Sequence, residues 1–369
     1  MNSLFFQLIR VSIGTQSSIS RLPSASEWGK LYNMAEKQSL LGVCFEGLQN
    51  LGADGEEGFA RIGISEDLYF QWVGMAAQIQ QRNEEVNRQC VELQARLATD
   101  GFRSYIMKGQ GNAALYGSLS TLRQPGDIDV YLEGGMDKVL AYARSVGETS
   151  GVNELEMHVK VFDNTEVEFH YRPFIMRNPF RNRRLQAFFK SQEEACFANR
   201  IALADGGEIC APTLEFNLIH QLSHIRLHLF TEGVGMRQLM DYYFVLKASE
   251  DVDTDIVQKV VKALGLQRFA SALMWVMQDV FGIDGSSLKI LGVEPDEVDG
   301  RLLLEQVMVG GNFGKYNKEQ NRKKKKSGYG LWALLVRNLK LSRFDRGDWF
   351  WGPLWRVYHF AWRKIKGYK

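Results

Sequence analysis

The sequence predicts an α+β protein in which a mixed sheet lies between two helical regions. Apolar residues recur at helical spacing through the first hundred residues and again after residue 212. Between these regions, short β-branched and aromatic segments alternate with turns and helical segments, which is typical of a sheet with interleaved helices. The length of 369 residues suits two or three domains of about 150 residues each.

Composition divides the chain into four regions. Residues 1–100 form a helical region, residues 101–211 a core with strands, residues 212–310 a second helical region, and residues 311–369 a basic tail rich in tryptophan. The four cysteines lack metal-ligand spacing, and no stretch approaches the roughly 18 apolar residues of a bilayer span. The first residues lack the basic segment of a signal peptide. We therefore expect a cytoplasmic protein.

Two helices are predicted in the first region. The apolar spacing indicates one helix that begins at Ser24 or Ser26 and closes on Gly52. A second, long helix has Ser65 as its candidate N-cap and ends at Gly101. Because apolar residues recur along its whole length, we expect the second helix to pack against the core that follows.

The core alternates strands with helical segments. A β-branched and aromatic segment ends at Gly109, and another begins at Asp127. The dipeptide Asp163-Asn164 separates two alternating segments and indicates a hairpin turn between two strands. The expected elements are a strand in 102–109, helical turns in 110–117, a strand in 127–132, a helix in 136–147, two strands in 156–173 and a hairpin in 201–212.

Helices return after Pro212. Thr213 is a candidate N-cap, and an apolar stripe predicts a helix that extends to residue 230. Further helices are expected in residues 235–248, 253–265 and 267–282. The polar stretch 317–330 predicts a mobile linker before the end of the tail.

The stretch "RQPGDIDVYL" places two aspartates two residues apart in a strand. Alternation puts Asp127 and Asp129 on one face, while Ile128 and Val130 point to the other. Two neighbouring carboxylates are costly unless a cation or a solvated cleft receives them, and Mg²⁺ prefers such oxygen ligands. Gly126 allows a ligand to approach the backbone closely. The pair alone is equally consistent with the solvent-exposed face of a strand at the edge of the sheet.

A later strand repeats this arrangement. Glu166, Glu168 and His170 share one face of "TEVEFHY". If this strand neighbours the first, three carboxylates converge, and such a set can hold two metal ions about 3.5–4 Å apart that clamp a phosphoryl group. Glu168 is the first candidate for the third carboxylate and Glu166 the second.

Two basic residues near the aspartates predict phosphate contacts. Lys108 and Gly109 end a strand and open a short helix, whose backbone N–H groups can receive a phosphate. Arg123 lies four residues before Asp127, where its guanidinium could reach a phosphate oxygen.

Histidines recur every four residues in "HQLSHIRLH". His220 and His224 have metal-ligand spacing, but Gln221 stands where a zinc protease has glutamate. A helix face with hydrogen-bonded imidazoles is the alternative to a zinc site. On the following helix, Arg237 and Asp241 have the spacing of an ion pair, which could also orient the arginine for a triphosphate.

The tail is electrostatically separate from the rest of the chain. Residues 315–369 contain 16 Lys and Arg against 3 Asp and Glu, and they include five of the eight tryptophans. An amphipathic helix on an anionic membrane surface has this composition, and so does a segment that binds nucleic acid. The third alternative is that the aromatic residues pack onto the acidic remainder of the same chain.

The order of these motifs resembles a known family. "YIMKGQGNAALYG…LRQPGDIDVYL…VEFHYRP…HQLSH…MRQLMDYYFVL" is similar to an uncharacterised bacterial nucleotidyltransferase family of the DNA polymerase beta superfamily, over roughly residues 25–285. The resemblance implies a polymerase beta-like nucleotidyltransferase core, a mixed sheet with helices. This chain departs from the usual pattern in having Gln110 after Gly109, and Glu in place of Asp at position 168.

The resemblance also implies a reaction. It predicts transfer of a nucleoside monophosphate from an NTP to an unidentified acceptor hydroxyl, with Mg²⁺ or Mn²⁺ bound by Asp127, Asp129 and Glu168. The residues expected to contact the nucleotide are Lys108, Gly109, Arg123, Gly126, His220, His224 and Arg237. The alternative is an inactive nucleotide-binding or scaffold protein that acts through residues 315–369 on a membrane surface or nucleic acid.

Overall fold

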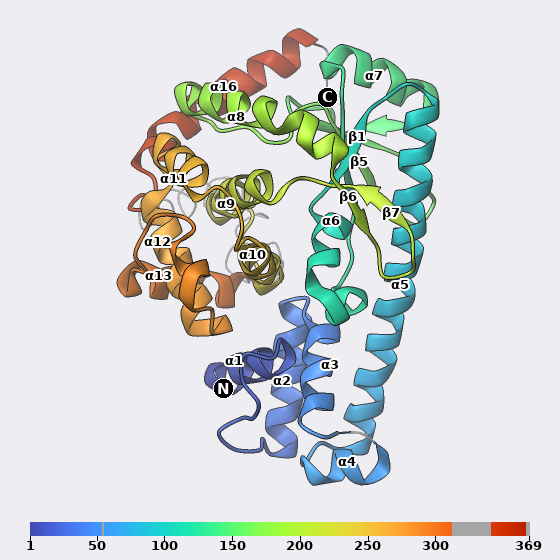
Figure 1. Ribbon diagram of the computed structural model, residues 1–369, viewed down its shortest axis with the longest axis vertical. Coiled ribbons are helices and arrows are strands. Elements are labelled where there is room, and N and C mark those ends of the chain that lie inside the picture. Colours follow the sequence, from blue (N-terminus) through green and yellow to red (C-terminus); the bar gives the residue numbers. More distant parts are fainter. Residues whose placement is uncertain (54, 312–340, 367–369) are drawn as a thin grey trace.

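Helix α5 (Glu66–Thr99) runs along the long axis of the molecule and joins the N-terminal helices to the sheet (Figure 1). The computed structural model describes residues 1–53, 55–311 and 341–366. Near one end of α5, Trp72 is fully buried among the N-terminal helices; near the other, Val86 and Cys90 pack beneath the sheet. The long helix predicted between residues 65 and 101 is confirmed.

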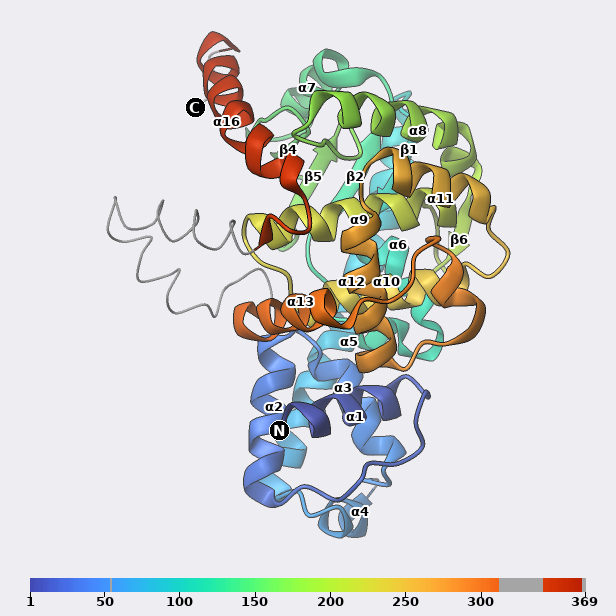
Figure 2. The ribbon, with the colours of Figure 1, turned by 90° about the vertical axis from the view of Figure 1, so that its left-hand side faces the viewer.

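At the N-terminal end of the described residues, helices α1 to α4 lie beside the first half of α5 (Figures 1 and 2). They are α1 (Asn2–Ser12), α2 (Ala25–Lys37), α3 (Leu41–Asn50) and α4 (Gly55–Arg61). Ser24 caps α2 through a capping box with Glu27, as one of the two predicted caps. The prediction of one helix from residue 24 to residue 52 is wrong, because Ser39 adopts a φ of 56° and separates α2 from α3.

The sheet has five strands in the spatial order β1-β2-β5-β4-β3. They are β1 (Ser104–Met107), β2 (Ile128–Leu132), β3 (Thr149–Ser150), β4 (Glu156–Val159) and β5 (Val167–His170). Strands β2 and β5 are parallel, and the other neighbouring pairs are antiparallel. A parallel pair needs a crossover, which here passes through α7 (Gly135–Val146), β3 and β4. The mixed α+β class is confirmed.

Helical segments precede and follow the sheet, as the sequence predicts. The turns after β1 form α6 (Gly109–Ala113) and the 3₁₀ segment Ala114–Leu122. Helix α8 (Pro179–Ala198), which the sequence analysis did not predict, is capped by Asn178 and leads to the hairpin of β6 (Arg200–Ala202) and β7 (Glu208–Cys210). The later helices are α9 (Leu214–Phe230), α10 (Met236–Ala248), α11 (Thr254–Ala263), α12 (Gln267–Val276) and α13 (Glu297–Gly310). Thr213 caps α9 by accepting a hydrogen bond from the Phe216 amide.

The two faces of the sheet have different surroundings. Ile128 and Val130 are buried against α5 and α7. On the opposite face, Tyr131 stacks on Tyr105 with ring centroids 4.8 Å apart, and both rings pack with apolar side chains of α8 and α9. Asp129 lies on this second face and is therefore directed toward the C-terminal helices.

The described part of the tail is anchored to the body. Leu341 and Phe344 are buried in the main core, and the Asp345 carboxylate lies 2.6 Å from Arg181 of α8 and 2.8 Å from Arg226 of α9. Helix α16 (Arg346–Lys366) follows. The predicted linker 317–330 lies outside the described residues, and the four region boundaries stay predictions. Among the described helices, none combines the length and hydropathy of a membrane span.

Replacement of Trp72 by alanine should destabilise the fold. The indole is fully buried, and its N–H donates a hydrogen bond of 2.8 Å to the Leu41 carbonyl. Trp72→Ala should lower the free energy of unfolding by about 3–5 kcal/mol in urea denaturation. Gln78→Ala, at an exposed position of the same helix, should change it by less than about 0.5 kcal/mol. Equal losses for the two variants would contradict the packing described for α5.

Candidate active site

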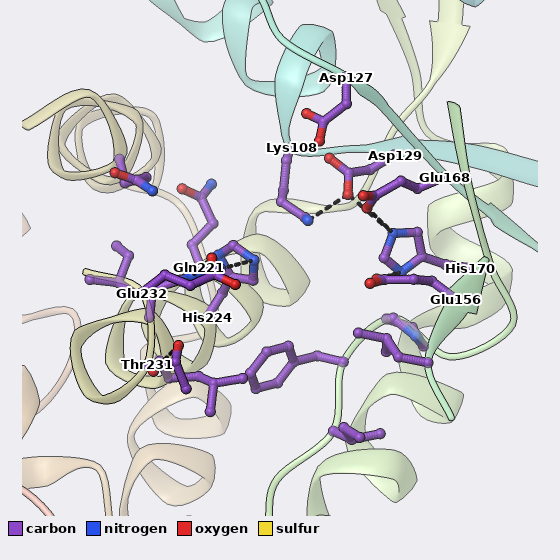
Figure 3. Close-up of a pocket in the computed structure, with 18 of the residues that line it drawn as sticks. Lys108, Asp127, Asp129, Glu156, Glu168, His170, Gln221, His224, Thr231 and Glu232 are labelled. Carbon is purple, nitrogen blue, oxygen red and sulfur yellow. Dashed lines mark hydrogen bonds and ion pairs between the residues drawn. The ribbon is translucent and has the colours of Figure 1, made fainter. Parts of the chain in front are cut away.

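Three carboxylates meet at the start of the parallel strand pair. Asp129 on β2 lies directly opposite Glu168 on β5, and Asp127 immediately precedes β2. Figure 3 shows the three carboxyl groups directed toward one region of a pocket. The two acidic strands are therefore neighbours, which is the condition under which the sequence predicts that three carboxylates converge. The Glu166 side chain is 64% exposed and lies 2.7 Å from His158. The Glu168 side chain is only 14% exposed and faces Asp129. This difference favours Glu168 as the third carboxylate.

Lys108 is the nearest cation to the carboxylates. It follows β1 with a φ of 45°, a conformation that residues other than glycine rarely adopt. From this turn its Nζ atom lies 2.5 Å from Asp129 Oδ1. A Cβ atom at Gly109 would lie 3.4 Å from the Asp127 carbonyl oxygen, so a glycine suits this close approach. The unusual turn thus aims an ammonium group into the carboxylate cluster.

His170 joins the carboxylates from the second position after Glu168. Its Nε2 atom lies 3.1 Å from Asp129 and 3.4 Å from Glu168, and its Nδ1 atom lies 3.3 Å from Glu156 on β4. Burial alone would lower the pKa of His170, but the surrounding carboxylates raise it to about 10. The imidazole is therefore positively charged at neutral pH, and Asp129 lies between two cations.

The carboxyl groups differ in pKa because their neighbours differ. Burial favours a raised pKa for Asp129, yet Lys108 and His170 outweigh it and hold the pKa well below its usual range. The negative charge of Asp129 raises the pKa of Asp127. Burial raises the pKa of Glu168 to about 7. Negative charge at Asp127 is therefore not fully compensated by the cations of the chain.

These residues fit a divalent cation. Asp129 and Glu168 offer carboxylate oxygens that lie within 4.8 Å of one another and of a His170 ring nitrogen. The protonated His170 orients these carboxylates and is not itself a ligand. Asp127 is a further carboxylate of this group. Asp129 repels its negative charge, and a bound cation would compensate that charge. Carboxylate oxygens of this kind suit Mg²⁺ and Mn²⁺.

The carboxylates line a cavity of about 640 Å³. Its size lies within the range of roughly 300–1,000 Å³ that is typical of small-molecule sites. The sheet supplies one wall, and α9 supplies another with Gln221 and His224 (Figure 3). Trp355 and His359 of α16 also line it. The tail therefore contributes to the same cavity as the acidic strands.

Arg123 is held by a carboxylate of the chain. Its Nε and Nη2 atoms lie 2.7 and 2.9 Å from the two oxygens of Asp241, and Tyr116 donates a further hydrogen bond of 2.6 Å to Oδ1. The Arg123 and Asp241 side chains are 4% and 7% exposed. Asp241 thus pairs with Arg123, a partner that the spacing of the sequence did not indicate. The phosphate contact predicted for Arg123 stays a prediction.

Arg237 reaches the cavity from α10. Its Nη1 atom donates a hydrogen bond of 3.0 Å to the carbonyl oxygen of Gln124. A Cβ atom at Gly126 would lie 3.7 Å from the same Nη1 atom, so the glycine lies beside the guanidinium. Both residues line the cavity with Asp127. Burial, followed by the charge of Arg123, lowers the pKa of Arg237.

The histidines of α9 have different surroundings. His224 and His228 line the cavity, and their Nε2 atoms lie 3.0 Å apart. His220 was expected to face the cleft, but it is fully buried and lies 3.1 Å from the Pro173 carbonyl oxygen. Four residues are slightly more than one helical turn, so successive histidines are rotated around the helix axis and do not all face the cavity. Among the described residues, the α9 histidines belong to no group of three ligands.

Several polar residues of the site were not predicted from the sequence. Glu156 comes from β4, and its approach to His170 depends on the strand order. The side-chain oxygen of Asn112 accepts hydrogen bonds from Asn217 and Gln221, at 2.9 and 3.0 Å. Gln221 was noticed only as the residue that replaces a protease glutamate, and the surrounding sequence carries no signal for Asn112.

Comparison with known proteins identifies one family. Residues 24–282, well over half of the chain, match the model of a family described as uncharacterised nucleotidyltransferase. No curated protein and no solved structure matches the chain.

Replacement of Asp241 should leave an uncompensated buried charge. In Asp241→Asn, the Arg123 guanidinium loses its carboxylate partner while it remains buried, and the free energy of unfolding should fall by about 3–5 kcal/mol. Glu297→Gln removes the acid of an exposed pair with Arg301 and should cost less than about 1 kcal/mol. Urea denaturation of both variants gives the comparison. A loss for Asp241→Asn no larger than that for Glu297→Gln would contradict a buried, charged Arg123.

His220 should make the protein sensitive to acid. Burial lowers the pKa of His220 to about 3, from 6.5 in the unfolded chain. Between these values the unfolded state binds a proton that the folded state does not, so stability falls as the pH drops below about 6.5, by about 1.4 kcal/mol per pH unit. His220→Gln should therefore show a shallower decline of the free energy of unfolding from about pH 6 to pH 4. An unchanged slope would show that His220 does not remain neutral.

Proposed function

The chain belongs to this uncharacterised nucleotidyltransferase family, and from that premise we propose that it transfers a nucleoside monophosphate from an NTP to an acceptor hydroxyl. The observation that carries the proposal is the register of β2 and β5, which sets Asp129 opposite Glu168 in the cavity that Asp127 and Lys108 also line. We further propose that the sheet belongs to the polymerase beta-like class; its acidic, parallel β2–β5 pair supports this assignment.

The proposed reaction is an in-line displacement. The oxygen of the acceptor hydroxyl forms a bond to the α-phosphorus of the NTP, and the bond from that phosphorus to the bridging oxygen breaks. Pyrophosphate leaves with the electron pair of the broken bond. Glu168 accepts the proton of the hydroxyl, a role supported by its place beside Asp129 at the cavity wall.

Asp127, Asp129 and Glu168 would hold Mg²⁺ or Mn²⁺. When bound, the cation supplies charge neutralisation for the phosphoryl oxygens. The chain itself orients the triphosphate through Lys108 and Arg237, whose cationic groups line the same cavity as Asp127. Gly109 and Gly126 leave room for the phosphates close to the backbone. Positioning and charge compensation then carry most of the catalysis.

Two of the predicted nucleotide contacts receive different roles. Arg123 positions the site through its bond to Asp241, and Tyr116 donates to the same carboxylate. His224, which lines the cavity, is proposed to contact the nucleotide or the acceptor, whereas His220 supports α9 from beneath.

An inactive nucleotide-binding or scaffold protein is the alternative. A third carboxylate that points away from the aspartates would favour it. Glu168 instead lies opposite Asp129 and within 3.4 Å of His170, which supports the enzyme.

Nucleotide binding should stabilise the protein only with a divalent metal. At a concentration of NTP–Mg²⁺ about 100 times its Kd, the free energy of unfolding should rise by about 2.7 kcal/mol. Asp127→Asn and Glu168→Gln should remove the metal-dependent part of this stabilisation, because each removes a carboxylate of the proposed site. Thermal unfolding with each NTP, with Mg²⁺, Mn²⁺ or chelator, provides the measurement.

Glu166→Gln is the matched control for Glu168→Gln. Both glutamates contact His158, but the exposed Glu166 has no place in the proposed site, so its variant should retain the stabilisation. If no NTP stabilises the wild-type chain with either metal, the proposed function is wrong. If Glu166→Gln loses the effect and Glu168→Gln keeps it, the third carboxylate is misassigned.

A further inference from the structure

Helix α16 concentrates exposed apolar side chains. Of the thirteen large apolar side chains that are exposed in the described residues, six lie on this one helix, with exposures between 50% and 84%. They are Phe350, Leu354, Val357, Tyr358, Phe360 and Ile365. An apolar surface of this kind on a single helix marks a place where a partner binds.

One side of α16 already packs on the body of the protein. Trp351 meets Phe180 of α8 edge to face, with centroids 6.3 Å apart, and the Arg177 guanidinium lies 5.7 Å from the Trp355 ring. Trp355 also stacks on His359 at 4.7 Å. Trp351, Trp355 and Trp362 are half-buried. Tyr358 and Ile365 share this side by helical spacing, and Tyr358 interacts with Glu154 of the body. The outer apolar side chains are therefore Phe350, Leu354, Val357 and Phe360.

The anchor before α16 keeps the helix in this orientation. Asp345 pairs with Arg181 and Arg226, and Arg343 lies 2.7 Å from the fully buried carboxylate of Asp299. Figure 2 shows α16 at one edge of the molecule, projecting past α8 and β4. With its base tied to the core, the helix has its inner side against the body and its outer side toward solvent.

The charge of α16 identifies the chemistry of the partner. The sequence has no acidic residue after Asp348, whereas Arg356, Arg363, Lys364 and Lys366 lie within the helix. Arg356 and Lys364 are exposed beside Val357 and Phe360. A face that combines Phe, Leu and Val with arginine and lysine is complementary to a surface that is apolar beneath and anionic above.

We propose that the outer face of α16 binds the surface of an anionic membrane, with the helix lying in the plane of the interface. Its exposed apolar side chains would enter the acyl boundary, and its basic side chains would meet anionic headgroups. Two of the outer side chains, Leu354 and Val357, are aliphatic and cannot stack on bases, while Trp351 and Trp355, which could do so, face the body. Contact with a second copy would bring like-charged helices together.

Flotation with lipid vesicles tests the proposal on the full-length chain. The protein should float with vesicles that contain phosphatidylglycerol and stay in solution with pure phosphatidylcholine, and added salt should weaken its binding. Phe360→Asp should abolish flotation, because it places a charge at the apolar interface. Arg356→Gln and Lys364→Gln should each weaken the partition by roughly fivefold.

Val298→Asp is the matched control. Val298 lies on α13 and is 65% exposed, against 66% for Phe360, so both variants add one charge at a similarly exposed site. Val298→Asp should float as the wild type does, and both variants should keep the wild-type melting temperature.

Three results would overturn the proposal. The first is wild-type protein that fails to float with phosphatidylglycerol, and the second is Phe360→Asp that floats as the wild type does. The third is binding to single-stranded oligonucleotides, or dimerisation in light scattering, that Phe360→Asp removes while vesicles have no effect. None of these results depends on nucleotide transfer, so the proposed function is tested separately.

Discussion

The site depends on a buried carboxylate held between two cations. Asp129 lies 2.5 Å from the Lys108 ammonium and 3.1 Å from the His170 imidazole. Taking an ion out of water costs several kcal/mol, so an aspartate that is 3% exposed would be unstable there without such partners. Lys108 follows β1, Asp129 lies on β2 and His170 on β5, so the order of three adjacent strands assembles the group. The same order brings Glu168 beside Asp129.

Local patterns in the sequence predicted the members of this site that share a strand. Alternation along a strand is a local property, so Asp127 with Asp129, and Glu168 with His170, could be assigned to common faces. Glu156 could not, because its approach to His170 depends on a third strand. For the same reason the sequence offered Arg237 as a partner of Asp241 but could not indicate Arg123, which lies 118 residues away.

Helical regions were predictable where the apolar spacing was regular, as in α5, but their breaks were less so. The left-handed backbone of Ser39 that separates α2 from α3 has no counterpart in the apolar pattern. His220 is a second example. The sequence shows that histidines recur along α9, but it does not show that His220 is buried against Pro173. The direction of a side chain on a nearly all-buried helix is set by its neighbours in space.

The cavity and the tail are parts of one arrangement. Trp355 and His359 on the inner side of α16 line the cavity, while the outer side carries exposed apolar and basic residues. A membrane bound to α16 would therefore lie near the cavity, which connects the proposed nucleotidyl transfer to a surface where acceptors can be concentrated.

A crystal structure with Mn²⁺ and an NTP analogue that cannot be cleaved at the α-phosphate tests the central claim most directly. The account predicts an anomalous scattering peak within coordination distance of Asp127, Asp129 and Glu168, with the triphosphate extending toward Lys108. A nucleotide bound elsewhere, or in the cavity with no manganese at these carboxylates, would contradict it.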